Sequence, residues 1–161
     1  MSKYKRYSFS HESISINGIK KIIFDKSNYS TLNYRIIGID LFLGRSIMNN
    51  KFFSYQLDKF DSVESFLNKG IGFVALNNNE ILGVASTSTI CKKGMDINII
   101  VLPNSRRKGV GKSLSAFLIN AILDKEIIPN WDATNKNSYY LALSLGYTPI
   151  GSYDAYHISK K

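Results

Sequence analysis

Cysteine is nearly absent from this sequence, and several other features that would place it in a particular class are missing. A single cysteine, Cys91, excludes an internal disulfide and supplies no cluster of metal ligands. The longest apolar stretch, residues 36–43, contains Asp40 and is far shorter than the roughly 20 residues that span a bilayer. The basic residues near the N-terminus are followed by polar residues, not by the apolar segment of a secretory signal. We therefore expect a cytoplasmic protein with no membrane contact and no metal.

Acidic residues are also scarce, because 12 Asp and Glu stand against 21 Lys and Arg and leave a net charge of +9. The basic residues are dispersed and form no stripe interleaved with aromatic residues, which would be typical of a nucleic-acid-binding surface. An anionic cofactor, or simple solubility, explains the charge without a nucleic acid partner. The 161 residues, 44% of them apolar, are enough for one domain that buries roughly 70% of its unfolded surface.

Residues 95–125 carry the clearest pattern in the chain. Residues 97–101 are rich in β-branched side chains and predict a strand. A short basic loop with two glycines follows, and then an apolar stripe has helical spacing at Val110, Leu114, Phe117, Leu118, Ala121 and Ile122. Because the first turn of a helix has unpaired N–H groups and a partial positive charge, this strand–loop–helix unit suits a diphosphate.

Two known loops share these residues. Gly111-Lys112-Ser113 matches the end of a Walker A loop, but that loop needs a glycine where this sequence has Arg106. Arg106, Gly109 and Gly111 satisfy a different pattern, Arg/Gln-x-x-Gly-x-Gly/Ala between a strand and a helix. In this the region resembles the acetyl-CoA pyrophosphate loop of the GCN5-related N-acetyltransferases (GNAT). The loop alone leaves open a tight basic turn that binds nothing.

A second motif lies nearer the C-terminus. Many GNAT proteins read Asn-x-x-Ser/Ala-x-x-Leu-Tyr-x-x-x-Gly-Phe, and this sequence matches at Asn135, Ser138, Leu141, Gly146 and Tyr147. Two motifs in the right order are more specific than either one, so the chain is identified as a member of the GNAT family. Residues 129–135, Pro-x-Trp-Asp-Ala-x-Asn, more particularly resemble the subgroup that contains zwittermicin A resistance proteins.

The resemblance implies an α/β (α+β) protein with the GNAT fold, a mixed, mostly antiparallel central sheet that is flanked by helices and splayed after the fourth strand. We expect a single domain over residues 1–161, with an acceptor-side part at residues 1–70 and an acetyl-CoA-binding part at residues 71–161. The predicted strands are 71–76, 81–90, 95–101, 127–132, 147–150 and 152–158, and the predicted helices of this part are 110–125 and 135–145.

The first seventy residues predict structure but little chemistry. Residues 14–24 are typical of a hairpin around the Asn17-Gly18 pair. Apolar residues between 32 and 47 have the spacing of the inner face of a helix that Ser30 or Thr31 would cap. Gly38 weakens this helix, and Gly44 is a candidate for its end. Asp61 with Glu64 predicts a capping box for a short helix closed by Gly70. His11, Glu12, Tyr34 and Tyr55 are not assigned, although they belong to the part that forms the acceptor wall in this family.

The resemblance also assigns residues to acetyl-CoA, the expected co-substrate. Main-chain amides from residues 107–113 would bind its diphosphate, and a main-chain N–H of Ile99 or Val101 would hold the acetyl carbonyl and the pantetheine. The full set of cofactor-binding residues that we expect is Ile99, Ile100, Val101, Arg106, Arg107, Lys108, Gly109, Val110, Gly111, Lys112, Ser113, Asn135 and Ser138.

The catalytic residues are less well marked. In the GNAT family an acidic residue near this end of the strand often relays the amine proton through water, and Asp96 is the only carboxylate in the strand before the loop. The resemblance therefore implies Asp96 as the base, with a solvent-exposed aspartate at a strand edge as the alternative. The tyrosine that serves as general acid in many GNAT proteins is replaced by Ala142. Tyr139, three residues earlier on the same predicted helix, could supply the hydroxyl, could merely pack, or water could protonate the thiolate.

These residues imply an acetyl-CoA-dependent N-acetyltransferase. It would transfer an acetyl group to a primary amine of a small-molecule acceptor by direct attack on the thioester, with no nucleic acid or membrane partner. A homodimer is compatible with this prediction. The alternatives are a protein or peptide N-acetyltransferase and a non-catalytic acyl-CoA-binding sensor of the same fold.

Overall fold

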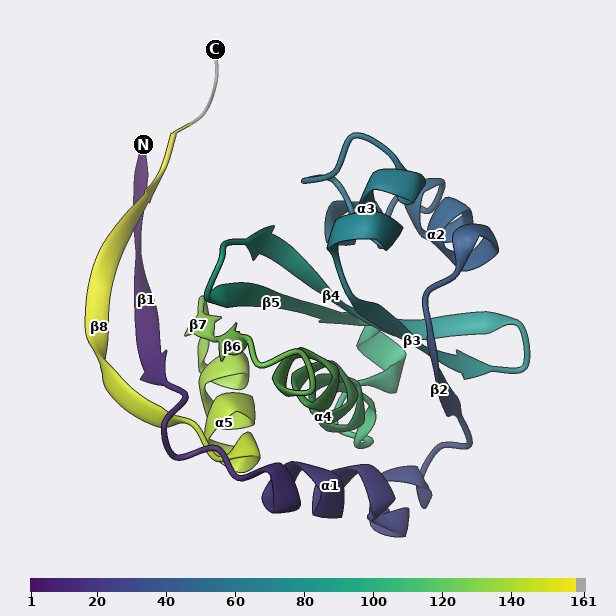
Figure 1. Cartoon of the computed structure of the whole chain (residues 1–161), viewed down its shortest axis with the longest axis horizontal. Coiled ribbons are helices and arrows are strands. Elements are labelled where there is room, and N and C mark those ends of the chain that lie inside the picture. The colour runs from purple at the N-terminus through teal and green to yellow at the C-terminus, as the bar shows by residue number, and fades with distance from the viewer. Residues whose placement is uncertain (159–161) are drawn as a thin grey trace.

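The strands of the protein form two sheets. The computed structural model describes residues 1–158; its five-stranded sheet has the order β2-β3-β4-β5-β6 and its three-stranded sheet the order β7-β1-β8 (Figure 1). The strands are β1 (Ser2–Ser10), β2 (Arg35–Gly38), β3 (Gly72–Asn77), β4 (Glu80–Ile90), β5 (Gly94–Val101), β6 (Ile128–Asn130), β7 (Asp132–Ala133) and β8 (Thr148–His157). In the larger sheet only β5 and β6 run parallel, which confirms the mixed, mostly antiparallel arrangement that the sequence predicts.

Helices cover both faces of the five-stranded sheet (Figure 1). They are α1 (Ile16–Phe24), α2 (Leu41–Met48), α3 (Val63–Lys69), α4 (Val110–Leu123) and α5 (Lys136–Leu145). Because successive side chains of a strand point to opposite faces, Ala75 and Ala85 pack under α4, whereas Val74 and Val84 pack against α2 and α3 beside Phe66. None of the helices in residues 1–158 is long and apolar enough to cross a membrane.

The two helices predicted in residues 71–161 lie where the sequence predicts them. Helix α4 begins after Gly109, whose φ of +85° is a left-handed conformation that glycine adopts without strain. Helix α5 is capped by Asn135, which accepts a hydrogen bond from the N–H of Ser138 at 2.9 Å, and ends at Gly146 with φ of +101°. The predicted strand at residues 127–132 is divided into β6 and β7, which belong to different sheets, and the two predicted terminal strands are one strand, β8.

The predicted hairpin at residues 14–24 is wrong, since this segment contains helix α1. Ser15 caps the helix by accepting a hydrogen bond from the N–H of Gly18 at 3.2 Å. Ile19 is completely buried and packs in the cluster that includes Ile119 of α4. The Asn17-Gly18 pair therefore lies in the first helical turn, because burial of the helical apolar face outweighs its preference for a tight turn.

The predicted helix at residues 32–47 is wrong in its first half. Arg35–Gly38 form the edge strand β2, which pairs with β3. Helix α2 begins only after Asp40, whose carboxylate accepts a hydrogen bond from the N–H of Leu43 at 2.8 Å. An aspartate in the middle of an apolar run is thus an N-cap that separates a strand from a helix.

Two smaller corrections concern the packing of α2 on α3. Gly44, predicted to end a helix, lies inside α2, because a Cβ there would overlap a methyl group of Val63 in α3. Helix α3 is capped by Ser62, whose hydroxyl accepts a hydrogen bond from the N–H of Ser65 at 3.0 Å, and not by Asp61. Gly70 follows its last residue, as predicted.

The sequence analysis missed strand β1. This strand pairs with β8 along its whole length, from Ser2 opposite His157 to Ser10 opposite Thr148, and with β7 at Tyr7 and Ser8. Together β1 and β8 form a curved ribbon beside the larger sheet, and the first residues of the chain lie at its free end (Figure 1).

Candidate functional site

An open cleft of ≈ 1700 Å³ lies where β5 and β6 separate. The two strands are paired only from Gly94 opposite Ile128 to Asp96 opposite Asn130, whereas β5 continues to Val101. Beyond that point β5 forms one wall of the cleft and α5 with the loop before it forms another. The prediction that the sheet is splayed after its fourth strand is therefore confirmed, because β5 is the fourth strand in the order of the sheet.

The end of β5 presents unpaired main-chain groups to the cleft. The N–H of Leu102 donates to Leu82 on β4, and bonded residues alternate along an antiparallel pair, so Ile100 and Asn98 also bond to β4. The N–H groups of Ile99 and Val101 then point toward the β6 side, where the strand pairing has already ended. Two main-chain donors are thus available in the cleft, at the residues that the sequence analysis selected.

The basic loop after β5 is held by its own side chains. Arg106 donates through Nε to the carbonyl of Val101 at 3.0 Å, and Lys108 donates through Nζ to the carbonyl of Asn104 at 2.8 Å. Arg106 and Arg107 line the cleft and Lys108 does not. Lys108 therefore stabilises the loop in this structure, and the cationic groups that face the cleft from this segment are Arg106, Arg107 and Lys112.

The first turn of α4 is open to the cleft. The N–H of Ser113 donates to the carbonyl of Gly109 at 3.0 Å, so the earlier N–H groups, from Val110 to Lys112, have no partner within the helix. A Cβ at Gly111 would make only ordinary contacts, with Val101 at 3.6 Å and Leu141 at 3.8 Å. This glycine lines the cleft at the N-terminus of α4, a place that suits an anion.

Ser113 supports the loop from behind and does not face the cleft. Its buried hydroxyl lies 3.0 Å from the hydroxyl of Tyr34, which in turn donates to the carbonyl of Asn28 at 2.9 Å. Asn28 also packs under Gly109, where a Cβ would approach its carbonyl oxygen to 2.5 Å. Burial raises the pKa of Tyr34 to about 12, against an opposing effect of the Ser113 hydrogen bond. The Ser113 hydroxyl is therefore held behind the loop and is not placed for the magnesium role of a Walker A serine, whereas the prediction for Ser113 concerned its main-chain N–H.

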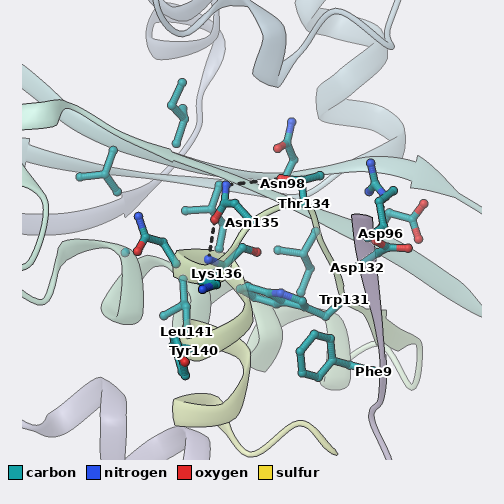
Figure 2. A pocket seen from close by; sticks show the side chains of 18 of the residues that line it. Phe9, Asp96, Asn98, Trp131, Asp132, Thr134, Asn135, Lys136, Tyr140 and Leu141 are labelled. Atoms are coloured by element: carbon teal, nitrogen blue, oxygen red, sulfur yellow. Dashed lines mark hydrogen bonds and ion pairs between the residues drawn. The ribbon is translucent and has the colours of Figure 1, made fainter. Parts of the chain in front are cut away.

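Helix α5 places Asn135, Ser138, Tyr140 and Leu141 on the cleft (Figure 2). Tyr139 does not line it, because its ring packs against Tyr7 and Phe9 with both centroid distances 5.2 Å. The sequence analysis selected Tyr139 as a source of the hydroxyl because it shares a predicted helical face with Ala142. In the structure the neighbouring Tyr140 lines the cleft instead. Ala142 is completely buried in the core.

The two carboxylates of the cleft lie at the end away from α5, and Figure 2 shows Asp96 and Asp132 on the side opposite Tyr140 and Leu141. Asp132 has both oxygens occupied, since Arg6 donates to Oδ1 at 2.8 Å and the hydroxyl of Tyr153 donates to Oδ2. This hydrogen bond raises the pKa of Tyr153. Burial lowers the pKa of Arg6, but the hydrogen bonds that its guanidinium donates to Tyr4 and Asp132 outweigh burial and leave the pKa raised.

Several cleft residues were missed by the sequence analysis. Arg6 comes from the unpredicted strand β1, so no pattern could have placed it here. Trp131 and Asp132 are part of the quoted 129–135 motif and were not given a role. The Trp131 indole nitrogen is buried and has no hydrogen-bond partner among residues 1–158. Residues 1–158 contain no group of three or more His, Cys, Asp or Glu that could hold a metal.

The residues present fit acetyl-CoA. One end of the cleft combines Arg106, Arg107 and Lys112 with the unpaired amides of α4, which suits phosphates. The extended edge of β5 offers N–H groups at Ile99 and Val101, which suit the amide-containing pantetheine arm. The other end of the cleft contains the carboxylates of Asp96 and Asp132.

Comparisons with known proteins agree with this geometry. The sequence model of the family described as GNAT acetyltransferase matches residues 1–156. A GCN5-related N-acetyltransferase-like protein from Streptococcus suis has a crystal structure with a TM-score of 0.87 and 25% identity, covering 95% of this chain and 60% of that one. An uncharacterized N-acetyltransferase of Bacillus subtilis, YdfB, is 26% identical over 106 residues, which are 65% of this chain and 41% of the relative. This chain therefore spans less than two thirds of either relative.

One solved structure that shares only the fold contains the expected co-substrate. It is a predicted acetyltransferase with acetyl-CoA from Clostridium acetobutylicum, with a TM-score of 0.56 and 14% identity over 71% of this chain and 90% of that one.

Proposed function

Because this chain belongs to the GNAT acetyltransferase family, we propose that it transfers the acetyl group of acetyl-CoA to a primary amine of a small molecule. One observation carries the proposal. A single cleft contains the free amides of the first turn of α4, the free amides of Ile99 and Val101, and the carboxylate of Asp96 at the other end. These are the groups that a diphosphate, a thioester carbonyl and an attacking amine each require.

The amides from Val110 to Lys112 would bind the diphosphate, with Arg106 and Arg107 adding positive charge at the cleft wall. The N–H groups of Ile99 and Val101 would hold the pantetheine and polarise the acetyl carbonyl. Apolar side chains at these positions are compatible with this role, because the contacts come from the main chain.

The acyl transfer is a direct attack of the neutral amine nitrogen on the thioester carbon. The new C–N bond forms, the C–S bond breaks and the sulfur leaves as a thiolate. Asp96 would take the proton of the attacking amine, directly or through water, because Asp132 already has both oxygens bonded. Water would protonate the thiolate, since the side chain of Tyr139 packs away from the cleft.

Binding of CoA is the first test. Calorimetry should show CoA binding to the wild-type chain and none to Gly111→Trp, because Gly111 lines the cleft and an indole there would obstruct it at the N-terminus of α4. Gly111→Ala is the matched control and should bind CoA, since its Cβ makes only ordinary contacts. Tight magnesium-dependent ATP binding, with none for CoA, would contradict the proposal.

The acceptor class is tested by the release of free thiol from acetyl-CoA with a panel of amines. The panel should contain polyamines, aminated antibiotics, which the narrower resemblance to zwittermicin A resistance proteins suggests, and lysine-containing peptides. Turnover with peptides alone would favour the protein N-acetyltransferase. Tight binding of acetyl-CoA without thiol release from any amine would favour the non-catalytic sensor.

A further inference from the structure

The point where the cleft opens is marked by one side-chain pair. Asp96 and Asn130 form the last rung of the parallel pairing between β5 and β6. The side-chain amide of Asn130 donates through Nδ2 to Oδ1 of Asp96 at 3.3 Å. Among residues 1–158, Oδ2 of Asp96 has no hydrogen-bond partner, so one oxygen is held by Asn130 and the other is available to a ligand.

Glycine at position 94 leaves room for this amide. A Cβ at Gly94 would lie 2.5 Å from Nδ2 of Asn130 and 3.3 Å from its Cγ. The backbone of Gly94 does not itself require glycine, since the glycines with positive φ are Gly109 and Gly146. The absence of a side chain at position 94 therefore serves the neighbouring amide and not a turn.

Within residues 1–158, no element other than β6 provides a hydrogen-bond partner for the carboxylate of Asp96. The pairing of β4 with β5 is irregular between Thr87 and Ile90, so no β4 residue is registered opposite Asp96. The charged and titratable groups that line this end of the cleft from other elements are Arg6, Lys59, Asp132 and Tyr153. Arg6 and Tyr153 are bonded to Asp132, and no ion pair joins Lys59 to a carboxylate in residues 1–158.

We propose that Asn130 is a positioning residue that orients the carboxylate of Asp96 toward the attacking amine, and that Gly94 keeps the space that its amide occupies. The proposal rests on the proposed function, in which Asp96 is the base. A carboxylate at the end of a strand pairing has freedom to rotate, and a fixed hydrogen bond to one oxygen directs the other toward the cleft.

A double-mutant cycle tests this contact. Asn130→Ala removes the amide and Gly94→Ala displaces it, so each should lower kcat by about tenfold while the KM for acetyl-CoA is unchanged. Because both substitutions break the same contact, the double variant should be no slower than Asn130→Ala alone. Gly18→Ala, where a Cβ has its nearest neighbour at 3.5 Å, is the control and should be unaffected. Effects of Gly94→Ala and Asn130→Ala that multiply in the double variant would overturn the proposal.

A second variant gives a readout that a merely structural role would not change. Asn130→Asp places a like charge beside Asp96, so the acidic limb of the kcat/KM profile should move to higher pH. An acidic limb that stays in place contradicts the positioning role. If Asp96→Asn is as active as wild type, the base assignment and this inference both fail, whereas a slow Asp96→Asn with a multiplicative cycle overturns only the positioning.

The contact can also be followed without turnover. The protein can be labelled at the aspartate carboxyl carbons and observed by NMR. The chemical shift of the Asp96 carboxyl carbon should change in both Asn130→Ala and Gly94→Ala and should not change in Gly18→Ala. An unchanged shift in both variants overturns the inference even if no acceptor amine is found.

Discussion

Asp96 is the residue on which the proposed chemistry depends most directly. We expect Asp96→Asn to lower kcat/KM by about 10²-fold, because an amide cannot accept the amine proton, and to remove the acidic limb of the rate profile. Binding of CoA should be unchanged, since the groups that we propose for the phosphates lie at the other end of the cleft. Steady-state kinetics over a pH series measures both effects, and Asp124→Asn, at the exposed end of α4, is the control. Unchanged activity would place the base elsewhere.

Tyr139 of α5, in contrast to Asp96, is predicted to contribute little to the rate. The ring of Tyr139 packs between Tyr7 and Phe9, so its contribution is to the core and not to the thiolate. Tyr139→Phe should keep the wild-type kcat within about twofold, because the ring is retained. A loss of tenfold or more, with an altered alkaline limb, would show that the Tyr139 hydroxyl acts as the general acid after all.

The hydroxyl of Tyr34 connects stability to pH. Burial raises its pKa from 10.0 to about 12, so the neutral hydroxyl is favoured in the folded chain. This contribution is complete below pH 10 and is lost as the pH rises through 12. The difference in free energy of unfolding between wild type and Tyr34→Phe should therefore fall by about 1–3 kcal/mol over this range. Urea titrations at several pH values measure it, with the exposed Tyr55→Phe as control, and a constant difference would contradict it.

The packing of α2 on α3 leads to a prediction at the scale of elements. Gly44→Ala should destabilise the fold by about 1–3 kcal/mol, because the new Cβ overlaps Val63 and pushes the two helices apart. Gly18→Ala, in the first turn of α1, has space for its Cβ and should be neutral or stabilising by up to about 1 kcal/mol. Urea unfolding distinguishes the two, and equal effects would show that α2 can move away from α3 at little cost.

Elements were predictable from sequence where local signals and tertiary packing agree. Helices α4 and α5 have apolar spacing, a glycine or asparagine at the start and, for α5, Gly146 at the end, and all of these indicate the same structure. Around Asn17 the signals disagree, because the Asn-Gly pair favours a hairpin while burial of Ile19 against α4 favours a helix. Asp40 was overlooked as a cap because it interrupts a run of apolar residues that belong to two different elements.

The part of the candidate site that consists of main-chain groups could be predicted from the sequence. The loop glycines and the free amides of β5 follow from a strand–loop–helix motif that is contiguous in sequence. The end of the cleft that we propose for the acceptor is assembled from β1, the β6–β7 junction, β8 and the segment around Lys59, which are far apart in the chain. Arg6 and Asp132 are 126 residues apart, and no local pattern relates them.

The ribbon of β1 and β8 joins the two ends of the described chain. Deletion of most of β1 should affect binding of the acceptor amine and leave binding of CoA unchanged. Only Phe9 of β1 belongs to the buried core, while nearly all of β8 is exposed. A variant that lacks residues 1–8 should therefore stay folded and still bind CoA, because the groups that we propose for CoA lie on β5, the basic loop, α4 and α5.

The same variant loses Arg6, the ion-pair partner of Asp132, and the strand that pairs with β8. We expect the KM for the acceptor amine to rise by about tenfold, because the acceptor end loses one wall. Hydrogen exchange of amides in residues 148–157 should become fast, while those of β4 remain protected. Kinetics and exchange mass spectrometry measure the two effects in one preparation. Loss of protection throughout β4, together with loss of CoA binding, would show instead that the ribbon is essential to the whole fold.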